Sequence, residues 1–179
     1  MILGQLLAIL IILIPGAAGI LYRTSIKQAS IIGGAVDLTI AGIMYFIRPQ
    51  VGFFFIQNST MVFIVMVLAV YLLSTVYSTR YLKGVEVMGI SEPTYYLLLN
   101  LFTVSMLFSL EVNNYGLMWV GIEATTISSA LLLITEKTET SLEATWRYIV
   151  IVSAGVTFAF ISIILSAPPC FPVLNPCGR

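Results

Sequence analysis

The chain has 179 residues, of which 59% are hydrophobic and 9% are charged, and its mean hydropathy is +1.04. Soluble domains carry about 25% charged residues, so this chain has too little charge to cover a soluble surface. Its net charge is zero and its basic residues are scattered, which argues against a nucleic-acid interface. It has no histidine and only two cysteines, Cys170 and Cys177, too few for a zinc site or a disulfide framework.

The apolar residues occur in long runs, which is typical of helices that cross a bilayer and need about 20 residues each. Six spans are predicted, at about residues 2–22, 29–47, 60–79, 93–110, 115–135 and 141–166. The first contains Pro15-Gly16, but it has no basic start and is longer than the apolar part of a signal peptide, so we interpret it as a retained helix. We therefore predict one all-α transmembrane bundle, residues 1–167, followed by a proline-rich, non-helical tail, residues 168–179.

The basic residues favour one side of the predicted bundle. The loops after the first, third and fifth spans carry Arg23, Lys27, Arg80, Lys83 and Lys137. The opposite side carries only Arg48 and Arg179. The positive-inside rule then places the N-terminus outside and the three richer loops in the cytoplasm. We expect a multi-pass protein of the inner (cytoplasmic) cell membrane.

Glu123 lies inside the fifth span, in the sequence W-V-G-I-E-A-T-T-I-S-S. It is about 12 Å from the outer end, near the middle of the bilayer, where a charge costs about 3 kcal/mol. Thr126 is one turn further on the same face, and Ser129 supplies another hydroxyl group that can order water. Two interpretations remain open: an ion or proton relay carboxylate lined by Thr126 and Ser129, or a structural hydrogen bond between helices.

Arg147 is the second charge inside a span. The sequence Thr140-Ser141-Leu142-Glu143 fits a helix capping box with Thr140 as the cap, and Glu143 precedes Arg147 by four residues, the favourable order for an ion pair. Glu143 is then either a cap with a surface ion pair or a functional acid, and Arg147 either extends to the lipid headgroups or faces Glu123. The depths of Arg147 and Glu123 differ by about 8 Å, so we expect contact through water.

At that separation and an effective dielectric constant near 20, the attraction between Arg147 and Glu123 is about 2–3 kcal/mol. A cation that approaches or withdraws would then decide whether Glu123 holds its proton. This is the physical basis of a relay driven by charge.

Two further acids lie near or within spans. Asp37 is in the middle of the second span, and Gly33-Gly34 one turn earlier allow another helix to approach. We interpret Asp37 as a protonated acid that forms a hydrogen bond between helices, with a place in the polar lining of an ion path as the alternative. Glu111 precedes Asn113-Asn114 in the outer turn between the fourth and fifth spans, so we expect it to be solvated.

Two segments of the chain resemble a known family. The stretch N-N-Y-G-L-M-W-V-G-I-E-A-T-T-I-S-S-A-L-L, followed by S-L-E-A-T-W-R-Y-I-V-I, resembles the antiporter-like membrane subunits of complex I relatives. These belong to the proton-translocating NADH–quinone oxidoreductase chain family. The chain looks most like the branch that accompanies membrane-bound nickel–iron hydrogenases and related ferredoxin-dependent complexes. Y-S-T-R-Y-L and Y-Y-L-L-L-N-L-F upstream fit the same family, so the resemblance covers about residues 1–166.

The resemblance implies roles for three residues. Family members are fourteen-helix proteins with two inverted five-helix repeats, each holding half of an ion path. Their functional glutamate in the fifth helix matches Glu123. The basic residue and the glutamate of their E-A-x-W-K-Y segment match Arg147 and Glu143. Because arginine essentially never deprotonates, Arg147 would tune charge without passing a proton.

The resemblance also implies the setting in which the chain works. It would be a non-redox membrane subunit of an oxidoreductase complex, in contact with lipid and with other membrane subunits. Iron–sulfur clusters and a nickel–iron or related centre would lie in those partners, with no cofactor or metal in this chain.

Family members continue into further helices, whereas A-P-P-C-F-P-V-L-N-P-C-G-R does not look like family sequence. We interpret the chain as an antiporter-like subunit shortened after about six helices, which is the N-terminal part of that fold. It either contributes part of a proton or sodium path centred on Glu123 or has a purely structural, assembly role. An independent small transporter is disfavoured because the second repeat is missing.

Overall fold

The computed structural model describes residues 2–21, 26–47, 57–81, 92–133 and 139–166. Its elements are six helices: α1 (Ile2–Leu21), α2 (Ile26–Ile47), α3 (Asn58–Tyr81), α4 (Glu92–Glu111), α5 (Tyr115–Leu133) and α6 (Glu139–Ser166). Each lies on one predicted span, so the all-α prediction is confirmed. Within the described residues, five helices, α2 to α6, are long and apolar enough to cross a membrane. The predicted proline-rich tail, residues 168–179, lies outside the described residues.

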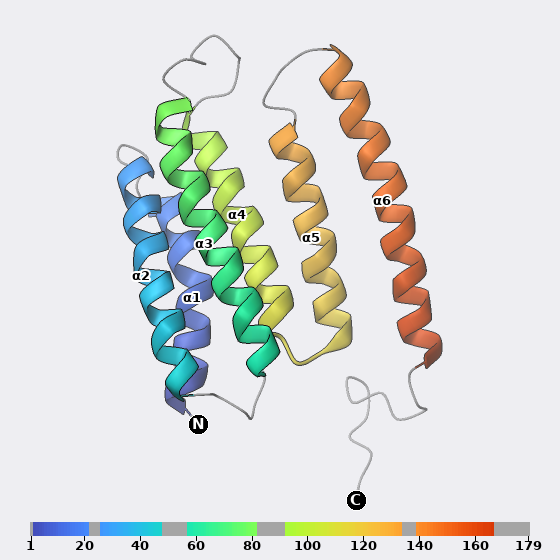
Figure 1. Cartoon of the computed structure of the whole chain (residues 1–179). Helices are drawn as coiled ribbons and strands as arrows, with labels where there is room; N and C mark the ends of the chain where they lie inside the picture. The colour runs from blue at the N-terminus through green and yellow to red at the C-terminus, as the bar shows by residue number, and fades with distance from the viewer. Residues whose placement is uncertain (1, 22–25, 48–56, 82–91, 134–138, 167–179) are drawn as a thin grey trace, which may run out of the picture.

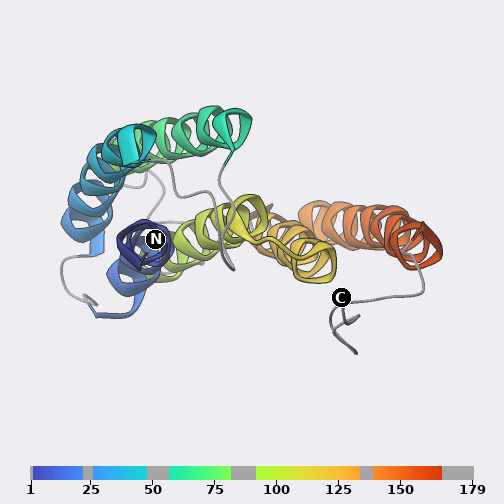
Figure 2. The same ribbon diagram turned by 90° about the horizontal axis from the view of Figure 1, so that it is seen from below.

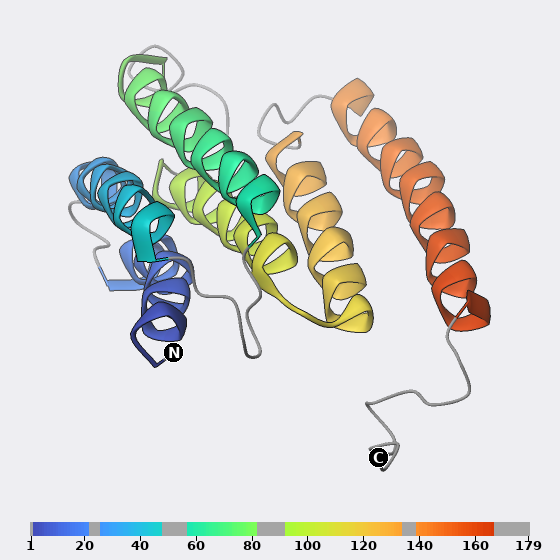
Figure 3. The same ribbon diagram turned by 60° about the horizontal axis from the view of Figure 1, so that its bottom comes forward.

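The helices run alternately up and down and form two unequal parts (Figure 1). Helices α1 to α4 make a compact group, from which α5 and α6 extend in a row (Figures 2 and 3). Helix α4 is central because it packs against α1, α2 and α3 on one side and against α5 on the other. Helix α6 packs mainly on α5, so the α5–α6 pair is attached to the α1–α4 group mainly through the interface between α4 and α5.

A heptad-like stripe on each helix faces the interior of the α1–α4 group. On α2 the stripe contains Ser30, Gly34, Asp37, Ala41 and Met44. Positions spaced by three or four residues share one face of a helix, so each stripe meets the other helices. The remaining faces of these helices expose many large apolar side chains, as expected of helices whose outer surface contacts lipid.

The interior of this group is apolar in one part and polar in another. The apolar cluster consists of Ala8, Ile11, Ala41, Met44, Met61, Ile64, Leu68 and Leu107. The buried residues of α4 are more polar: Tyr96, Asn100, Thr103, Ser105 and Glu111 carry polar groups, whereas Leu99 and Leu107 are aliphatic. Helix α4 therefore carries polar groups into the interior along most of its length.

Pro15 does not end the first helix. Helix α1 continues through Pro15 to Leu21, although proline removes one backbone hydrogen bond from a helix interior. Pro15 is fully buried, and a Cβ atom added to Gly16 would lie 3.7 Å from Val104 of α4. The Pro15-Gly16 pair thus packs against α4 inside the bundle.

The start of α5 has a side-chain cap, and the start of α6 differs from the prediction. The Asn114 side-chain oxygen accepts from the amides of Gly116 (2.9 Å) and Leu117 (3.2 Å), which satisfies two otherwise free donors at the helix start. Helix α6 begins at Glu139. Thr140 therefore lies inside the first turn of α6, and its predicted position as the cap before the helix is wrong.

Candidate functional site

Helix α6 is held to α5 by hydrogen bonds at both ends of their interface. The Trp119 indole N–H donates to the Val156 carbonyl oxygen (2.8 Å), and the Trp119 ring stacks on Phe160 with centroids 4.3 Å apart. At the other end, the Ser141 hydroxyl donates to the Leu133 carbonyl oxygen (3.0 Å). Lipid offers little hydrophobic drive for helices to associate, so such contacts fix their register.

Glu123 occupies the middle of this interface. Its Oε1 accepts a hydrogen bond of 2.7 Å from the Ser153 hydroxyl of α6. Its Oε2 is buried and has no hydrogen-bond partner among the described residues. Glu123 is near the middle of the 19-residue helix α5, which is long and apolar enough to cross a membrane, and its carboxyl group has one oxygen satisfied and one without a described partner.

The hydroxyl groups that follow Glu123 mainly bond to their own helix. The Thr126 hydroxyl donates to the Ile122 carbonyl oxygen (3.1 Å), and the Ser129 hydroxyl donates to the Thr126 carbonyl oxygen (2.9 Å). Ser129 also lies 3.3 Å from the Tyr148 hydroxyl of α6. Either hydroxyl could be the donor in that contact. Thr126 is buried, whereas Ser129 is half-buried and reaches α6.

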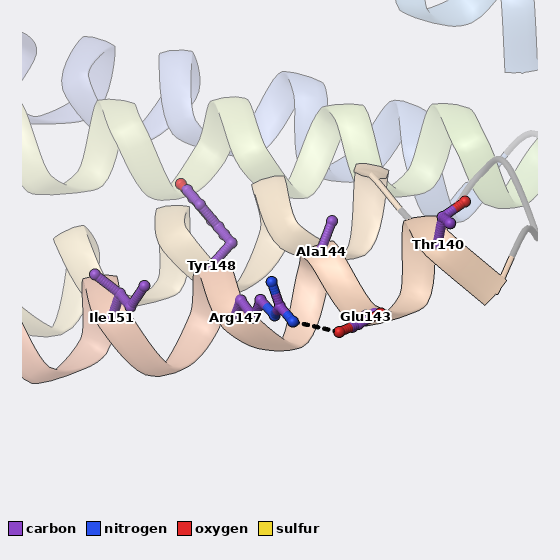
Figure 4. A pocket seen from close by; sticks show the side chains of 6 residues that line it. All are labelled: Thr140, Glu143, Ala144, Arg147, Tyr148 and Ile151. Atoms are coloured by element: carbon purple, nitrogen blue, oxygen red, sulfur yellow. Dashed lines mark hydrogen bonds and ion pairs between the residues drawn. The ribbon is translucent and has the colours of Figure 1, made fainter.

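Glu143 and Arg147 form an ion pair on another face of α6. Arg147 Nη2 lies 2.5 Å from Glu143 Oε1, and the two side chains are 74% and 64% exposed. They line an open groove with Thr140, Ala144, Tyr148 and Ile151, in which Arg147 extends along the helix toward Glu143 (Figure 4). The predicted pairing at i, i+4 is present.

The structure does not bring Arg147 to Glu123. Within the described part of the chain, no hydrogen bond or ion pair joins the two, because Arg147 contacts Glu143 and Glu123 contacts Ser153. Arg147 and Ser153 also lie on different faces of α6, since six residues are not a whole number of turns.

Asp37 and Glu111 lie elsewhere, in the interior of the α1–α4 group. Both side chains are fully buried, and all four of their carboxyl oxygens lack a hydrogen-bond partner among the described residues. The prediction that Asp37 forms a hydrogen bond between helices is therefore wrong for the described residues. The expectation that Glu111 is solvated is also wrong. Its spacing of eleven residues from Asn100 places it on the buried stripe of α4.

Sequence reasoning missed the partners that Glu123 and Ser129 have on α6. Ser153 and Tyr148 looked like ordinary polar residues of a span. The available signal was the register of an antiparallel helix pair, in which a step forward on α5 matches a step back on α6. The contacts of Trp119 with Val156, Glu123 with Ser153 and Ser129 with Tyr148 follow that register.

Comparison with known proteins finds a partial similarity. Over 115 residues the chain is 31% identical to a protein named hydrogenase-4 component F homolog from Methylacidiphilum infernorum (isolate V4). The match covers 62% of this chain and 24% of that protein, so the chain matches about a quarter of the length of this curated relative. No family model matches the chain, and no solved structure matches it.

Proposed function

We propose that this chain is a membrane subunit of a hydrogenase-type, complex I-related oxidoreductase, in which Glu123 contributes to a proton or sodium translocation path. The similarity to a hydrogenase-4 component F homolog and the long apolar helices support the membrane setting. Other membrane subunits of the inner membrane would be its neighbours. Iron–sulfur clusters and a nickel–iron or related centre would belong to partner subunits.

The half-satisfied carboxyl group of Glu123 is the observation that carries this proposal. Buried polar atoms are nearly always hydrogen-bonded, and an acid with a purely structural role gains most when both oxygens have partners. Here Ser153 holds one oxygen in place while the other stays open and buried. An open oxygen at mid-bilayer depth is where a proton, or a cation in its place, would be held.

The next polar groups toward the predicted cytoplasmic side are hydroxyls. Ser129 is six residues beyond Glu123, about 9 Å along α5, and Tyr148 meets it from α6. This pair, together with the Thr126 carbonyl that accepts from Ser129, would form the continuation of the path. Proton transfer between hydroxyls and the carboxyl group over that distance needs bridging water.

The Glu143–Arg147 pair would act from the side of the path. Both side chains are largely exposed on a groove of α6 that Tyr148 also borders. Arg147 keeps its charge, so it would adjust the electrostatic potential at the entrance rather than carry a proton. Asp37 belongs to a different part of the fold, and its role is argued below.

A structural role in assembly is the second candidate function, and the series of hydrogen bonds between α5 and α6 supports it. Along α5 and α6, hydrogen bonds occur at Trp119, Glu123, Ser129 and Leu133. Glu123 is one contact in that series. If its only task is to hold α6, the complex would need the hydrogen bond and not the exchangeable proton.

The substitution Glu123→Gln separates the two functions. Glutamine keeps a carbonyl oxygen that accepts from Ser153 but has no proton to exchange at this site. We expect the assembled complex in membrane vesicles to form in normal amount and to lose most of its ion pumping. Ser153→Ala is the matched control, since it removes the hydrogen bond and keeps the acid. Normal pumping by the Gln variant, with reduced complex in the Ala variant, would refute transport and support assembly.

A further inference from the structure

The interior of α1 to α4 contains two acids that the α5–α6 site does not use. Asp37 of α2 and Glu111 of α4 both have 0% exposure. Neither carboxyl group has a hydrogen-bond partner among the residues described. A buried polar group that serves packing alone is normally satisfied, so two such acids in one four-helix group need an explanation.

Three other buried polar residues of the α1–α4 group are already bonded to one another. The Tyr71 hydroxyl of α3 donates to Asn100 Oδ1 of α4 (2.5 Å), and Asn100 Nδ2 donates to the Ser30 hydroxyl of α2 (3.3 Å). All three residues are buried. This network ties three helices together without including Asp37, which lies two turns after Ser30 on the same face of α2.

Asp37 is held close to this network by the packing of α3 on α2. A Cβ atom added to Gly34, one turn before Asp37, would lie 3.1 Å from the Tyr71 ring. The Tyr71 ring thus lies directly on α2 at this level. Counted from the Asn100–Ser30 hydrogen bond, Asp37 lies about 10 Å further along α2 and Glu111 about 17 Å further in the same direction along α4.

No positive group faces Asp37 from the described parts of the helices that pack around it. Tyr71 of α3 and Glu111 of α4 are the ionisable groups that interact with it, and α1 contains no ionisable side chain. Lys27 is on the same helix but about 15 Å away along its axis. A negative charge on Asp37 would therefore be buried without a counterion, at a cost of several kcal/mol.

We propose that Asp37 and Glu111 form a second proton-binding site, inside the α1–α4 group and separate from Glu123. Binding is the reversible protonation of a carboxylate, so no other reactant is needed. A proton fits better than a divalent cation, because such cations need six or more oxygen ligands. No group of three or more acidic, histidine or cysteine side chains that would hold a metal occurs among the residues the structure describes.

The site lies along the polar stripe of α4. Tyr96, Asn100 and Thr103 precede Glu111 on the same buried face. Protons would enter or leave this site through the interior of the α1–α4 group and not through the α5–α6 interface. The inference does not depend on the proposed role of Glu123, since it rests on different helices and different contacts.

Infrared difference spectroscopy of the full chain in lipid, recorded as a function of pH, tests this site. A protonated carboxyl group has its own C=O stretching band, and two interacting acids titrate as a coupled pair with two steps. We expect such a two-step band in a Glu123→Gln protein, in which the carboxyl group of Glu123 does not contribute. Asp37→Asn should remove about half of its amplitude and leave a single step from Glu111. Glu143→Gln is the matched control, because that exposed acid is ion-paired and should leave the band unchanged.

Three results would overturn the proposal. The first is that Asp37→Asn does not reduce the band. The second is that the band of that variant still titrates in two steps. The third is that added Na⁺ abolishes the band at constant pH. If Asp37→Asn does not fold, the Glu123→Gln protein alone still tests the site, since absence of the two-step band there contradicts it. Glu123→Gln should leave the two-step signal of Asp37 and Glu111 intact, so failure of the ion path at Glu123 is distinguishable from failure here.

Discussion

The Ser153 hydroxyl and the Glu123 carboxyl group are joined by a 2.7 Å hydrogen bond across 30 residues of sequence. This contact sets the depth at which α6 meets α5, because Trp119 and Val156 bond one turn away in the same antiparallel register. One oxygen of the carboxyl group is thereby fixed in position, and Oε2 is buried without a hydrogen-bond partner among the described residues. The site is thus a consequence of helix register as much as of residue type.

Loss of the Ser153 hydroxyl should weaken the pairing of α5 and α6. Hydrogen bonds between membrane helices contribute about 0.6 kcal/mol on average and up to about 1.7 kcal/mol. We expect Ser153→Ala to lower the free energy of unfolding in mixed micelles by about 1 kcal/mol. Ser162→Ala on the same helix is the control, since Ser162 is exposed and should change stability by much less. Equal effects of the two variants would argue that the bond contributes nothing.

The contact between α4 and α5 should be intolerant of a larger residue at Gly121. A Cβ atom there would lie 2.7 Å from the Ser109 Cβ atom and 3.0 Å from its Cα atom. Because backbone cannot yield as a flexible side chain does, the helices must move apart, at a cost of about 1–3 kcal/mol. Gly121→Ala should therefore lower the unfolding free energy, measured in mixed micelles.

Gly155→Ala is the matched control for that prediction. No heavy atom lies within 4 Å of a Cβ atom added to Gly155, and alanine favours a helix by about 1 kcal/mol over glycine. This variant should be neutral or slightly stabilised. If both alanine variants behave alike, the close approach of α4 to α5 at Gly121 is not real.

The order and extent of the helices could be predicted from the sequence, whereas the partners of the buried acids could not. Run length and hydropathy place the α5 span because about 20 apolar residues are needed to cross a bilayer. The mid-bilayer depth of Glu123 follows from counting residues. Its partner Ser153 depends on how α5 and α6 slide past each other, and a single sequence does not determine that register.

Glu111 shows where local context misled the prediction. Its position beside Asn113-Asn114 favoured a solvated turn, but the spacing from Asn100 puts it on the interior stripe of α4. Helical periodicity outweighed the polar neighbours, because α4 is surrounded by helices on both sides. Asp37 was correctly placed in a span, but its lack of a described partner depends on how the neighbouring polar groups bond among themselves.

The Glu143–Arg147 pair should contribute little to the stability of the isolated chain. Both side chains are mostly exposed, and pairs at i, i+4 on exposed helix faces contribute about 0.3–0.5 kcal/mol. A double-mutant cycle with Glu143→Gln and Arg147→Gln, followed by unfolding in micelles, should give a coupling energy in this range. A coupling above about 1 kcal/mol would contradict the exposed geometry.

Apolar replacement of Asp37 and of Asn100 should have opposite effects on stability. Asp37→Leu removes two buried oxygens that have no described hydrogen-bond partner, and removing such a group recovers its desolvation penalty, about 1–3 kcal/mol. Asn100→Leu instead leaves the Tyr71 and Ser30 hydroxyls without their shared partner, which costs a similar amount. Unfolding free energies of the two variants in the same micelles measure the difference directly. A destabilised Asp37→Leu protein would mean that the carboxyl group is satisfied in the folded chain, and the second acid site inside α1 to α4 would then lose its physical basis.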